Sequence, residues 1–228
     1  MERLFRLDKK KSYIFFLIFT LSLCSCSTLN NGKIAPGYFQ AYELLRNLTT
    51  DSNEEISWST IEEIPYASMI LRVGNTQEAL LILESRINDS NIWVSSDRIY
   101  IEESNGRVLK TSGFYNNLSN IFGNLTFIDG KEGTSEERVY YYSFSNPTLS
   151  NLEVLVKQTY VGEETVKMRS GERVLRRYEE DYFSPRIGWK GKNIYWVDGQ
   201  KKVLKSLQSI TPKIEKFSFE EARPYSAK

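Results

Sequence analysis

The chain has 228 residues with a formal net charge of +1 at pH 7, no histidine and only two cysteines. This inventory lacks the commonest general base and the commonest protein ligand of transition metals, and the near-neutral charge does not fit a nucleic-acid-binding protein, which usually has a pI above about 9. We therefore expect no metal, no cofactor and no nucleic-acid partner. Carboxylates are plentiful, so a carboxylate-based glycoside hydrolase stays open as an alternative.

Residues 1–25 are typical of a secretory signal peptide. Five basic residues lie within residues 3–11, and the apolar run YIFFLIFTLSL follows at residues 13–23. As a helix, this run reaches only about 16 Å, whereas the hydrocarbon core of a bilayer is about 30 Å thick. The segment is therefore long enough to start export but too short to span a membrane comfortably.

Both cysteines lie at the end of this segment, and the sequence favours Cys26 over Cys24 as a lipidation site. A bacterial lipobox has a Leu at −3 and small residues before the acylated Cys. Cys26 is preceded by Leu23 and Ser25 at the −3 and −1 positions, whereas Cys24 has the bulky Leu23 at −1. A disulfide between the two cysteines would close too tight a ring. Ser27 at +2 resembles the sorting signal for the outer membrane.

Cleavage before Cys26 removes five basic and two acidic side chains, and the remaining chain has a net charge of −2. Membrane attachment then depends on lipid and not on electrostatics. We interpret residues 26–34 as a lipidated tether and residues 35–228 as a single β domain, a length that suits one hydrophobic core.

The first element expected after the tether is a short amphipathic helix within residues 35–47. Tyr38, Ala41, Tyr42 and Leu45 recur there at helical spacing.

From Ile64 onward, runs rich in aromatic and β-branched residues recur at short spacing and predict strands. Residues 91–113 predict two strands joined by a tight hairpin at Asn105-Gly106. Residues 76–87 have helical propensity, but their neighbours are strands and we expect a buried strand. Together the runs predict an all-β fold, an antiparallel meander that forms a sandwich or a partly closed barrel with one short N-terminal helix. Further strands are expected within 138–146, 152–162, 164–183, 192–212 and 214–222, with turns at 162–164, 170–172 and 198–200 and a loop at 182–191.

Trp93, Trp189 and Trp196 are candidates for a sugar-stacking platform, because the apolar faces of pyranose rings pack on aromatic rings. Packing in the core is the alternative, since aromatic residues are favoured in strands for structural reasons.

Several charged residues are weaker candidates for a functional site. The alternative interpretation is that they lie on a solvated strand face or in an exposed turn. Asp97, Glu102 and Glu103 are candidates for a hydrolytic carboxylate pair. Asp198 is expected to initiate a turn with Gly199. The basic candidates for binding acidic sugars are Arg72, Lys110, Arg173, Arg176 and Arg177. The charges of the last three, the arginines, are balanced by the nearby Glu179, Glu180 and Asp181.

Three blocks carry a resemblance to a known family: IPYASMILRVG (64–74), NIWVSSDRIYIEESNGRVLKTSGF (91–114) and NIYWVDGQKKVLKSLQSITPKIE (193–215). Behind a lipobox and in this order, they resemble the YjbF/GfcB family of outer-membrane lipoproteins, encoded with group 4 capsule or related exopolysaccharide genes. The resemblance implies a lipid-anchored domain that faces the periplasm. It also implies partners from the same gene cluster, a large outer-membrane β-barrel protein and a soluble periplasmic protein, and it carries over no catalytic residue.

The function expected from these observations is a non-enzymatic lipoprotein of the outer membrane, accessory to capsule or exopolysaccharide assembly or export, that binds a partner protein or a glycan. The alternative is a carboxylate-based enzyme that modifies polysaccharide, such as a glycoside hydrolase.

The lipobox comparison generates a direct prediction: Cys26, and not Cys24, carries the acyl groups. Mass spectrometry of the mature N-terminus is expected to show a lipidated peptide that begins at Cys26. The Cys26→Ser variant should lose membrane anchoring, because the acyl chains supply the membrane affinity. An acylated Cys24 would contradict the assignment.

Overall fold

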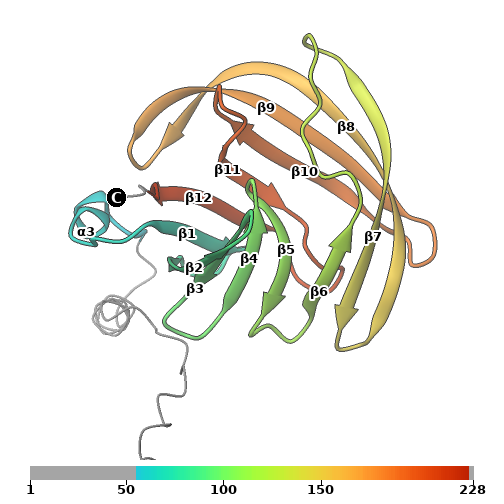
Figure 1. The fold of residues 1–228 in the computed structure, drawn as a ribbon, viewed down its shortest axis with the longest axis horizontal. Coiled ribbons are helices and arrows are strands. Elements are labelled where there is room, and N and C mark those ends of the chain that lie inside the picture. The colour runs from blue at the N-terminus through green and yellow to red at the C-terminus, as the bar shows by residue number, and fades with distance from the viewer. Residues whose placement is uncertain (1–54, 226–228) are drawn as a thin grey trace, which may run out of the picture. The chain divides into compact units, whose positions relative to one another are not determined.

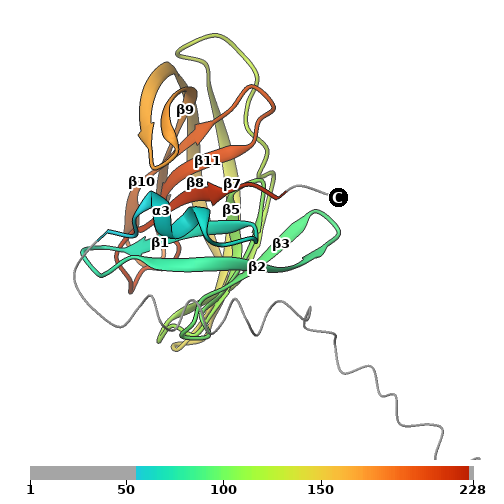
Figure 2. The same cartoon turned by 90° about the vertical axis from the view of Figure 1, so that its left-hand side faces the viewer.

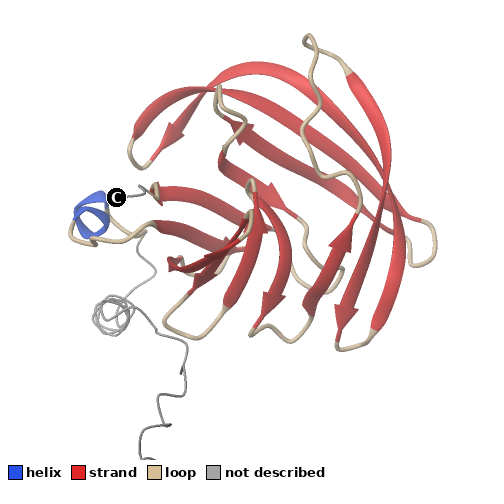
Figure 3. Ribbon diagram, in the orientation of Figure 1, coloured by secondary structure: helices blue, strands red, loops and turns tan. Residues whose placement is uncertain are grey.

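The computed structural model describes residues 55–225, which form an antiparallel sheet of twelve strands and one short helix, α3 (Trp58–Glu62) (Figures 1 and 3). The all-β prediction is confirmed. The signal peptide, Cys26 and the helix expected within residues 35–47 lie outside the described residues. The strands are β1 (Ser68–Val73), β2 (Ala79–Ile87), β3 (Ser90–Val94), β4 (Tyr100–Ser104), β5 (Arg107–Ser112), β6 (Asn117–Phe122), β7 (Ser135–Ser145), β8 (Leu149–Met168), β9 (Gly171–Ser184), β10 (Trp189–Val197), β11 (Val203–Gln208) and β12 (Phe217–Arg223).

The sheet curls into a nearly closed barrel. Strands β1 to β5 and β6 to β12 each pair with their neighbours in the chain, and pairing of β1 with β12 joins the two groups. The edges of the sheet are β5 and β6, which lie side by side (Figure 1). There the backbone N–H of Leu118 donates a hydrogen bond to Oγ1 of Thr111 at 2.9 Å. Of the two architectures expected, the structure therefore selects the barrel.

The hairpin predicted at Asn105-Gly106 is present between β4 and β5. Both residues have positive φ, 49° and 74°, as the tight two-residue turns of hairpins require. A Cβ atom at Gly106 would lie 2.3 Å from Cβ of Val203. Glycine therefore serves both the turn and the close approach of this hairpin to β11.

The strand expected within residues 76–87 is also confirmed, because Leu80, Leu81 and Ile82 of β2 are buried. The turns at 170–172 and 198–200 are present.

The turn expected at 162–164 was wrong. Strand β8 continues through it for 20 residues, and the register shifts between Tyr160 and Gly162, where Gly162 has a φ of 138°. The glycine thus marks a bulge inside a long strand and not its end. The loop expected at 182–191 is also shorter, because β9 continues to Ser184 and β10 begins at Trp189.

Two elements cover the outside of the barrel wall. Helix α3 begins after Ser57, whose hydroxyl accepts a hydrogen bond from the backbone N–H of Thr60 at 3.2 Å. The helix lies against β1 and β2 (Figure 2), and its Ile61 packs with Ile70, Leu80 and Ile82 of these strands. The long β8–β9 hairpin curls back over the barrel (Figure 1), and the backbone N–H of Arg169 at its tip donates to the Glu220 carboxylate on β12 at 2.5 Å.

The barrel interior contains a buried ion pair between Arg107 of β5 and Glu180 of β9. Nη1 and Nη2 of Arg107 lie 2.9 and 2.7 Å from the two carboxylate oxygens, and both side chains are at most 4% exposed. Oε1 of Glu180 also accepts hydrogen bonds from the hydroxyl of Tyr140 at 3.1 Å and from Nε2 of Gln158 at 2.8 Å. Paired and hydrogen-bonded in this way, the charges tolerate burial.

The segment that connects β6 with β7 packs against the same network. The Arg107 guanidinium lies 4.5 Å from the ring centroid of Phe127 and 4.6 Å from that of Tyr195. The backbone N–H of Ile128 donates to Oε1 of Gln158 at 2.7 Å. The connection is thereby fixed to the barrel interior by polar and aromatic contacts.

The network sets the protonation states of its members. Burial alone would raise the pKa of Glu180, but the charge of Arg107 and the hydrogen bonds from Arg107, Gln158 and Tyr140 hold it below its usual value. Burial and the Glu180 charge raise the pKa of Tyr140 to about 12 and the pKa of Tyr195 well above its usual value. At neutral pH the carboxylate is therefore charged and the phenols are protonated.

Removal of one partner of this pair is expected to destabilise the fold strongly. Arg107→Met leaves the buried Glu180 charge uncompensated and should lower the free energy of unfolding by about 3–5 kcal/mol. The double variant Arg107→Met/Glu180→Met should lose less than the sum of the two single variants. Urea unfolding followed by tryptophan fluorescence measures both effects, and additive losses would contradict this account.

The Arg107→Met penalty should also depend on pH. In the natural chain the depressed pKa of Glu180 contributes stability that is present above the unfolded pKa, about 4.3, and is lost as the pH falls through the folded pKa. Without Arg107, burial raises the pKa of Glu180, so the variant avoids the buried charge by binding a proton at mildly acidic pH. Urea unfolding should show a larger penalty at about pH 7.5 than at about pH 5.5. A penalty independent of pH would contradict this assignment.

Candidate functional site

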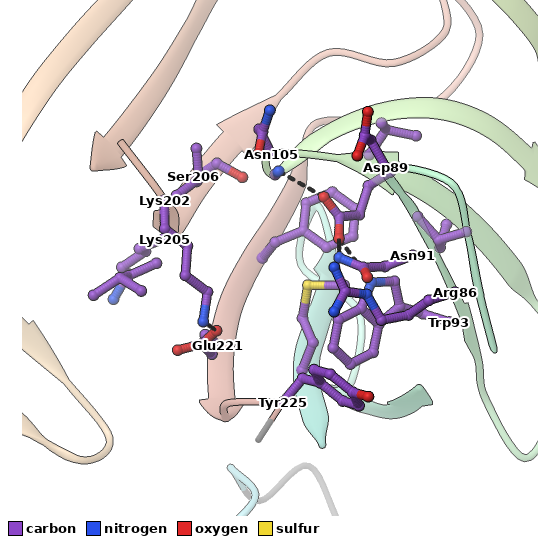
Figure 4. A pocket seen from close by; sticks show the side chains of 18 of the residues that line it. Arg86, Asp89, Asn91, Trp93, Asn105, Lys202, Lys205, Ser206, Glu221 and Tyr225 are labelled. Atoms are coloured by element: carbon purple, nitrogen blue, oxygen red, sulfur yellow. Dashed lines mark hydrogen bonds and ion pairs between the residues drawn. The ribbon is translucent and has the colours of Figure 1, made fainter. Parts of the chain in front are cut away.

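A pocket of about 300 Å³ opens at the mouth of the barrel between the β2–β5 side and the β11–β12 side of the wall. Figure 4 shows Arg86, Asn91 and Trp93 on one wall and the side chains of Lys202 and Glu221 on the facing wall. Barrel mouths are common places for ligand sites, because the strands hold the lining side chains rigidly.

Glu103 of β4 organises the first wall. Its carboxylate accepts hydrogen bonds from Nδ2 of Asn91 at 2.5 Å, from Nε1 of Trp93 at 3.1 Å and from the backbone N–H of Gly106 at 2.6 Å. Glu103 is only 6% exposed. Period-2 alternation explains its position, because Ile101 and Glu103 point to the same, inner side of β4.

Exposed residues form the rim of the pocket. The Arg86 guanidinium lies 4.8 Å from the ring centroid of Tyr225 (Figure 4), a cation–π contact. On the facing wall Lys202 forms an ion pair with Glu221. The pocket thus combines positively charged hydrogen-bond donors, negatively charged acceptors and aromatic side chains.

The structure does not bring the three candidate tryptophans together. Trp93 lines the pocket and is 7% exposed. Trp189 packs edge-on against Tyr142 at a centroid distance of 5.4 Å, and Trp196 donates from Nε1 to Glu164 and packs with a separate cluster. The sugar-stacking platform of three tryptophans therefore does not form, and Trp93 alone lies at the pocket.

The candidate carboxylates are also separated. Glu103 lines the mouth pocket, whereas Asp97 lines a different hollow, and Glu102 alternates with Glu103 along β4 and so lies on the opposite side of the strand. Asp198 accepts hydrogen bonds from the backbone N–H groups of Gln200 and Lys202 at 2.9 Å, which confirms its role in a turn.

The basic candidates serve structural contacts or remain apart from the pocket. Arg72 pairs with Glu78 at 2.8 Å and Arg176 with Glu163 at 3.5 Å. Arg177 pairs with Glu164 at 3.3 Å. None of the basic candidates lines the mouth pocket in the described part of the chain. Lys110 and Arg173 are exposed.

Sequence reasoning missed Arg86, Asn91 and Tyr225 as pocket residues. Arg86 and Asn91 pair across the β2–β3 hairpin, and Asn91 pairs with Glu103 across β3 and β4. These local registers were the available signals for the three residues. Tyr225 follows β12, and only the pairing of β12 with β1 brings it to the pocket.

Within residues 55–225 no group of three or more His, Cys, Asp or Glu side chains is arranged to hold a metal ion. In the same residues no helix is long and apolar enough to cross a membrane.

Comparison with known proteins identifies the family. Residues 41–221 match the family model YjbF, described as group 4 capsule polysaccharide lipoprotein GfcB, YjbF. The lipoprotein GfcB of Escherichia coli (strain K12) is 24% identical over 190 residues, which cover 79% of this chain and 83% of the relative. The lipoprotein YjbF of the same organism is 21% identical over 210 residues, which cover 88% of this chain and 92% of the relative.

The crystal structure of the hypothetical lipoprotein YmcC from Escherichia coli (K12) has the same fold, with a TM-score of 0.68 and 22% identity over 85% of this chain and 98% of that chain. The match to the family model spans most of the barrel and includes the strands that form the mouth pocket. The chain therefore belongs to the YjbF family of group 4 capsule polysaccharide lipoproteins.

Proposed function

We propose that this lipoprotein is a non-enzymatic accessory of capsule or exopolysaccharide assembly or export, and that it acts by binding. In this proposal the acyl groups on Cys26 hold it at the outer membrane with its domain in the periplasm. Its partners are a large outer-membrane β-barrel protein and a soluble periplasmic protein of the same export cluster, or the glycan itself.

The state of the carboxylates at the mouth pocket carries this proposal. A retaining or inverting glycosidase needs two carboxyl groups that flank the scissile bond, one of them free to transfer a proton. Here Glu103 is held by three hydrogen-bond donors and Glu221 by an ion pair with Lys202. The third lining carboxylate, Asp89, is exposed to solvent. These contacts fix the wall of a binding site and favour binding over proton transfer.

Family membership supports the cellular context. The matched family is described by its association with group 4 capsule polysaccharide and by its lipoprotein nature. The two matched relatives are likewise lipoproteins. A lipid anchor keeps the domain within reach of membrane partners without a large protein interface.

Deletion of the gene in its native host should lower the amount of polysaccharide at the cell surface, and the natural chain should restore it. Cys26→Ser should fail to restore it, because the domain is then no longer held near its partners. Asp97→Ala, Glu102→Ala and Asp181→Ala should restore it, because these carboxylates lie outside the mouth pocket. Surface polysaccharide is measured by a uronic acid or total-sugar assay of washed cells.

The hydrolase alternative makes a different prediction. Purified lipoprotein incubated with the polysaccharide of the same cells would release new reducing ends, and Glu103→Gln would abolish the release. We expect no release from the natural chain. Reducing ends that appear with the natural chain and disappear with Glu103→Gln would overturn the proposal.

A further inference from the structure

The size of the mouth pocket limits what it can bind. Its volume of about 300 Å³ lies at the lower end of the range for small-molecule pockets, about 300–1,000 Å³. A ligand of one or two sugar rings suits this volume, whereas a helix or a long stretch of glycan does not. The lining comes mostly from strands, so the shape of the pocket is fixed before a ligand arrives.

The pocket retains hydrogen-bonding capacity that its own residues do not use. An ionised carboxylate offers about four acceptor sites, and Glu103 uses three of them. No cation of residues 55–225 forms an ion pair with this buried group. A hydroxyl donor from a ligand would complete its hydrogen bonding, which is favourable because an incompletely satisfied buried charge is costly.

Arg86 supplies the complementary donors. A guanidinium has five N–H donors, and the contact that the structure gives this one is with the face of the Tyr225 ring. That contact orients the guanidinium and leaves its N–H edge available. In Figure 4 the guanidinium lies beside Asn91, next to the pocket wall.

The charges select a neutral ligand. Arg86 faces a pocket that also contains the acidic Asp89 and Glu103. The two lining lysines, Lys202 and Lys205, are already neutralised by ion pairs with Glu221 and Glu220. An anionic ligand would meet two carboxylates, and a cationic ligand would meet the guanidinium. A polyhydroxylated ring avoids both conflicts, because each hydroxyl both donates and accepts.

Apolar side chains form another part of the lining. Met69 and Phe219 line the pocket together with the aromatic face of Trp93. Aromatic and aliphatic surface suits the C–H face of a pyranose ring, whose hydroxyl groups point outward to the polar wall.

We propose that the mouth pocket binds one neutral pyranose residue of a glycan, with its hydroxyl groups held by Glu103 and Arg86. This inference rests on the proposed function, because it names the ligand class of that binding activity.

The indole N–H groups of the chain report on this site. The sequence has four tryptophans, and Nε1 of Trp93 donates to Glu103 inside the pocket, whereas Nε1 of Trp196 donates to Glu164 elsewhere. The ¹⁵N-labelled lipoprotein in detergent micelles is titrated with glucose, galactose and N-acetylglucosamine, and its indole resonances are assigned with Trp93→Phe and Trp196→Phe.

At least one of these sugars should shift the Trp93 resonance in a saturable manner and leave that of Trp196 unchanged. Sorbitol, an acyclic polyol, should give no saturable shift. Glucuronate should bind at least about tenfold more weakly than the best neutral sugar, because like charges in a partly buried site repel. No response of Trp93, an equal response to sorbitol, or equal binding of glucuronate would overturn the inference.

The Arg86→Ala variant tests the polar wall. Arg86 is exposed, so the variant should fold, as the unchanged resonance of Trp196 would verify. Its affinity for the best sugar should fall by about tenfold, the loss of one charge-assisted hydrogen bond. The matched control is Arg176→Ala, which removes an arginine of β9 whose side chain is 42% exposed and pairs with Glu163; it should bind as the natural chain does. Equal affinity of Arg86→Ala and the control would contradict the assigned role of Arg86.

The two proposals fail separately. If sugars leave Trp93 unaffected but deletion still removes surface polysaccharide, the pocket inference is wrong and the proposed function stands. If Trp93 responds but deletion leaves surface polysaccharide unchanged, the proposed function is wrong and the pocket stands.

Discussion

The pairing of Arg107 with Glu180 inside the barrel is the constraint on which the rest of the structure depends. A buried charge of either sign is costly unless a partner and hydrogen bonds satisfy it, so these residues, 73 positions apart, must meet when the sheet closes. Because Arg107 follows Gly106 directly, the pair also fixes the β4–β5 hairpin in place. Nε2 of Gln208 on β11 donates to the carbonyl of Gly106 at 2.8 Å, so the hairpin is held from both sides. The same hairpin carries Glu103, and the wall of the mouth pocket is therefore built on a part of the barrel that these contacts fix in place.

This coupling explains how a barrel with a filled interior can present a preformed pocket. The network of Glu180, Tyr140 and Gln158 occupies the interior, whereas Trp93 and Glu103 lie at its mouth. In the interior, the Glu180 carboxylate is satisfied by Arg107, Tyr140 and Gln158, whereas Glu103 at the mouth has three donors for its four acceptor sites. A site on rigid strands loses little conformational entropy when a ligand binds. This arrangement is what a binding protein needs, and it requires no moving catalytic group.

Local patterns in the sequence predicted the parts of the fold that depend on local chemistry. The alternation of residues 91–113 and the Asn105-Gly106 turn predicted two strands joined by a hairpin, because side-chain period and positive φ are properties of neighbouring residues. The hairpin is present, but the structure divides the first of these strands into β3 and β4. Gly162 misled the prediction, since a glycine in a bulge and a glycine in a turn look alike in sequence. Glu180 lies in an acidic run that suggested a solvated face, yet Tyr178 and Tyr182, two positions away on either side, are both buried. The period-2 spacing of these tyrosines was a signal for an inward-facing carboxylate, but its partner Arg107 becomes evident only when the barrel closes.

The separation of the tryptophans determines how this fold can meet a polysaccharide. A flat row of aromatic rings would bind the middle of a chain by stacking, but Trp189 and Trp196 pack in different clusters and are tied to partners of their own. A pocket closed by strands on two sides accepts a ring that enters from one direction. If the pocket binds a pyranose as proposed, the bound sugar is at the end or on a side branch of a glycan, where one ring projects from the chain, and not in its repeating interior. In the proposed function, with the protein held by lipid beside membrane partners, recognition of a chain end is compatible with passage of the rest of the polymer, because the bound residue does not obstruct the remaining length.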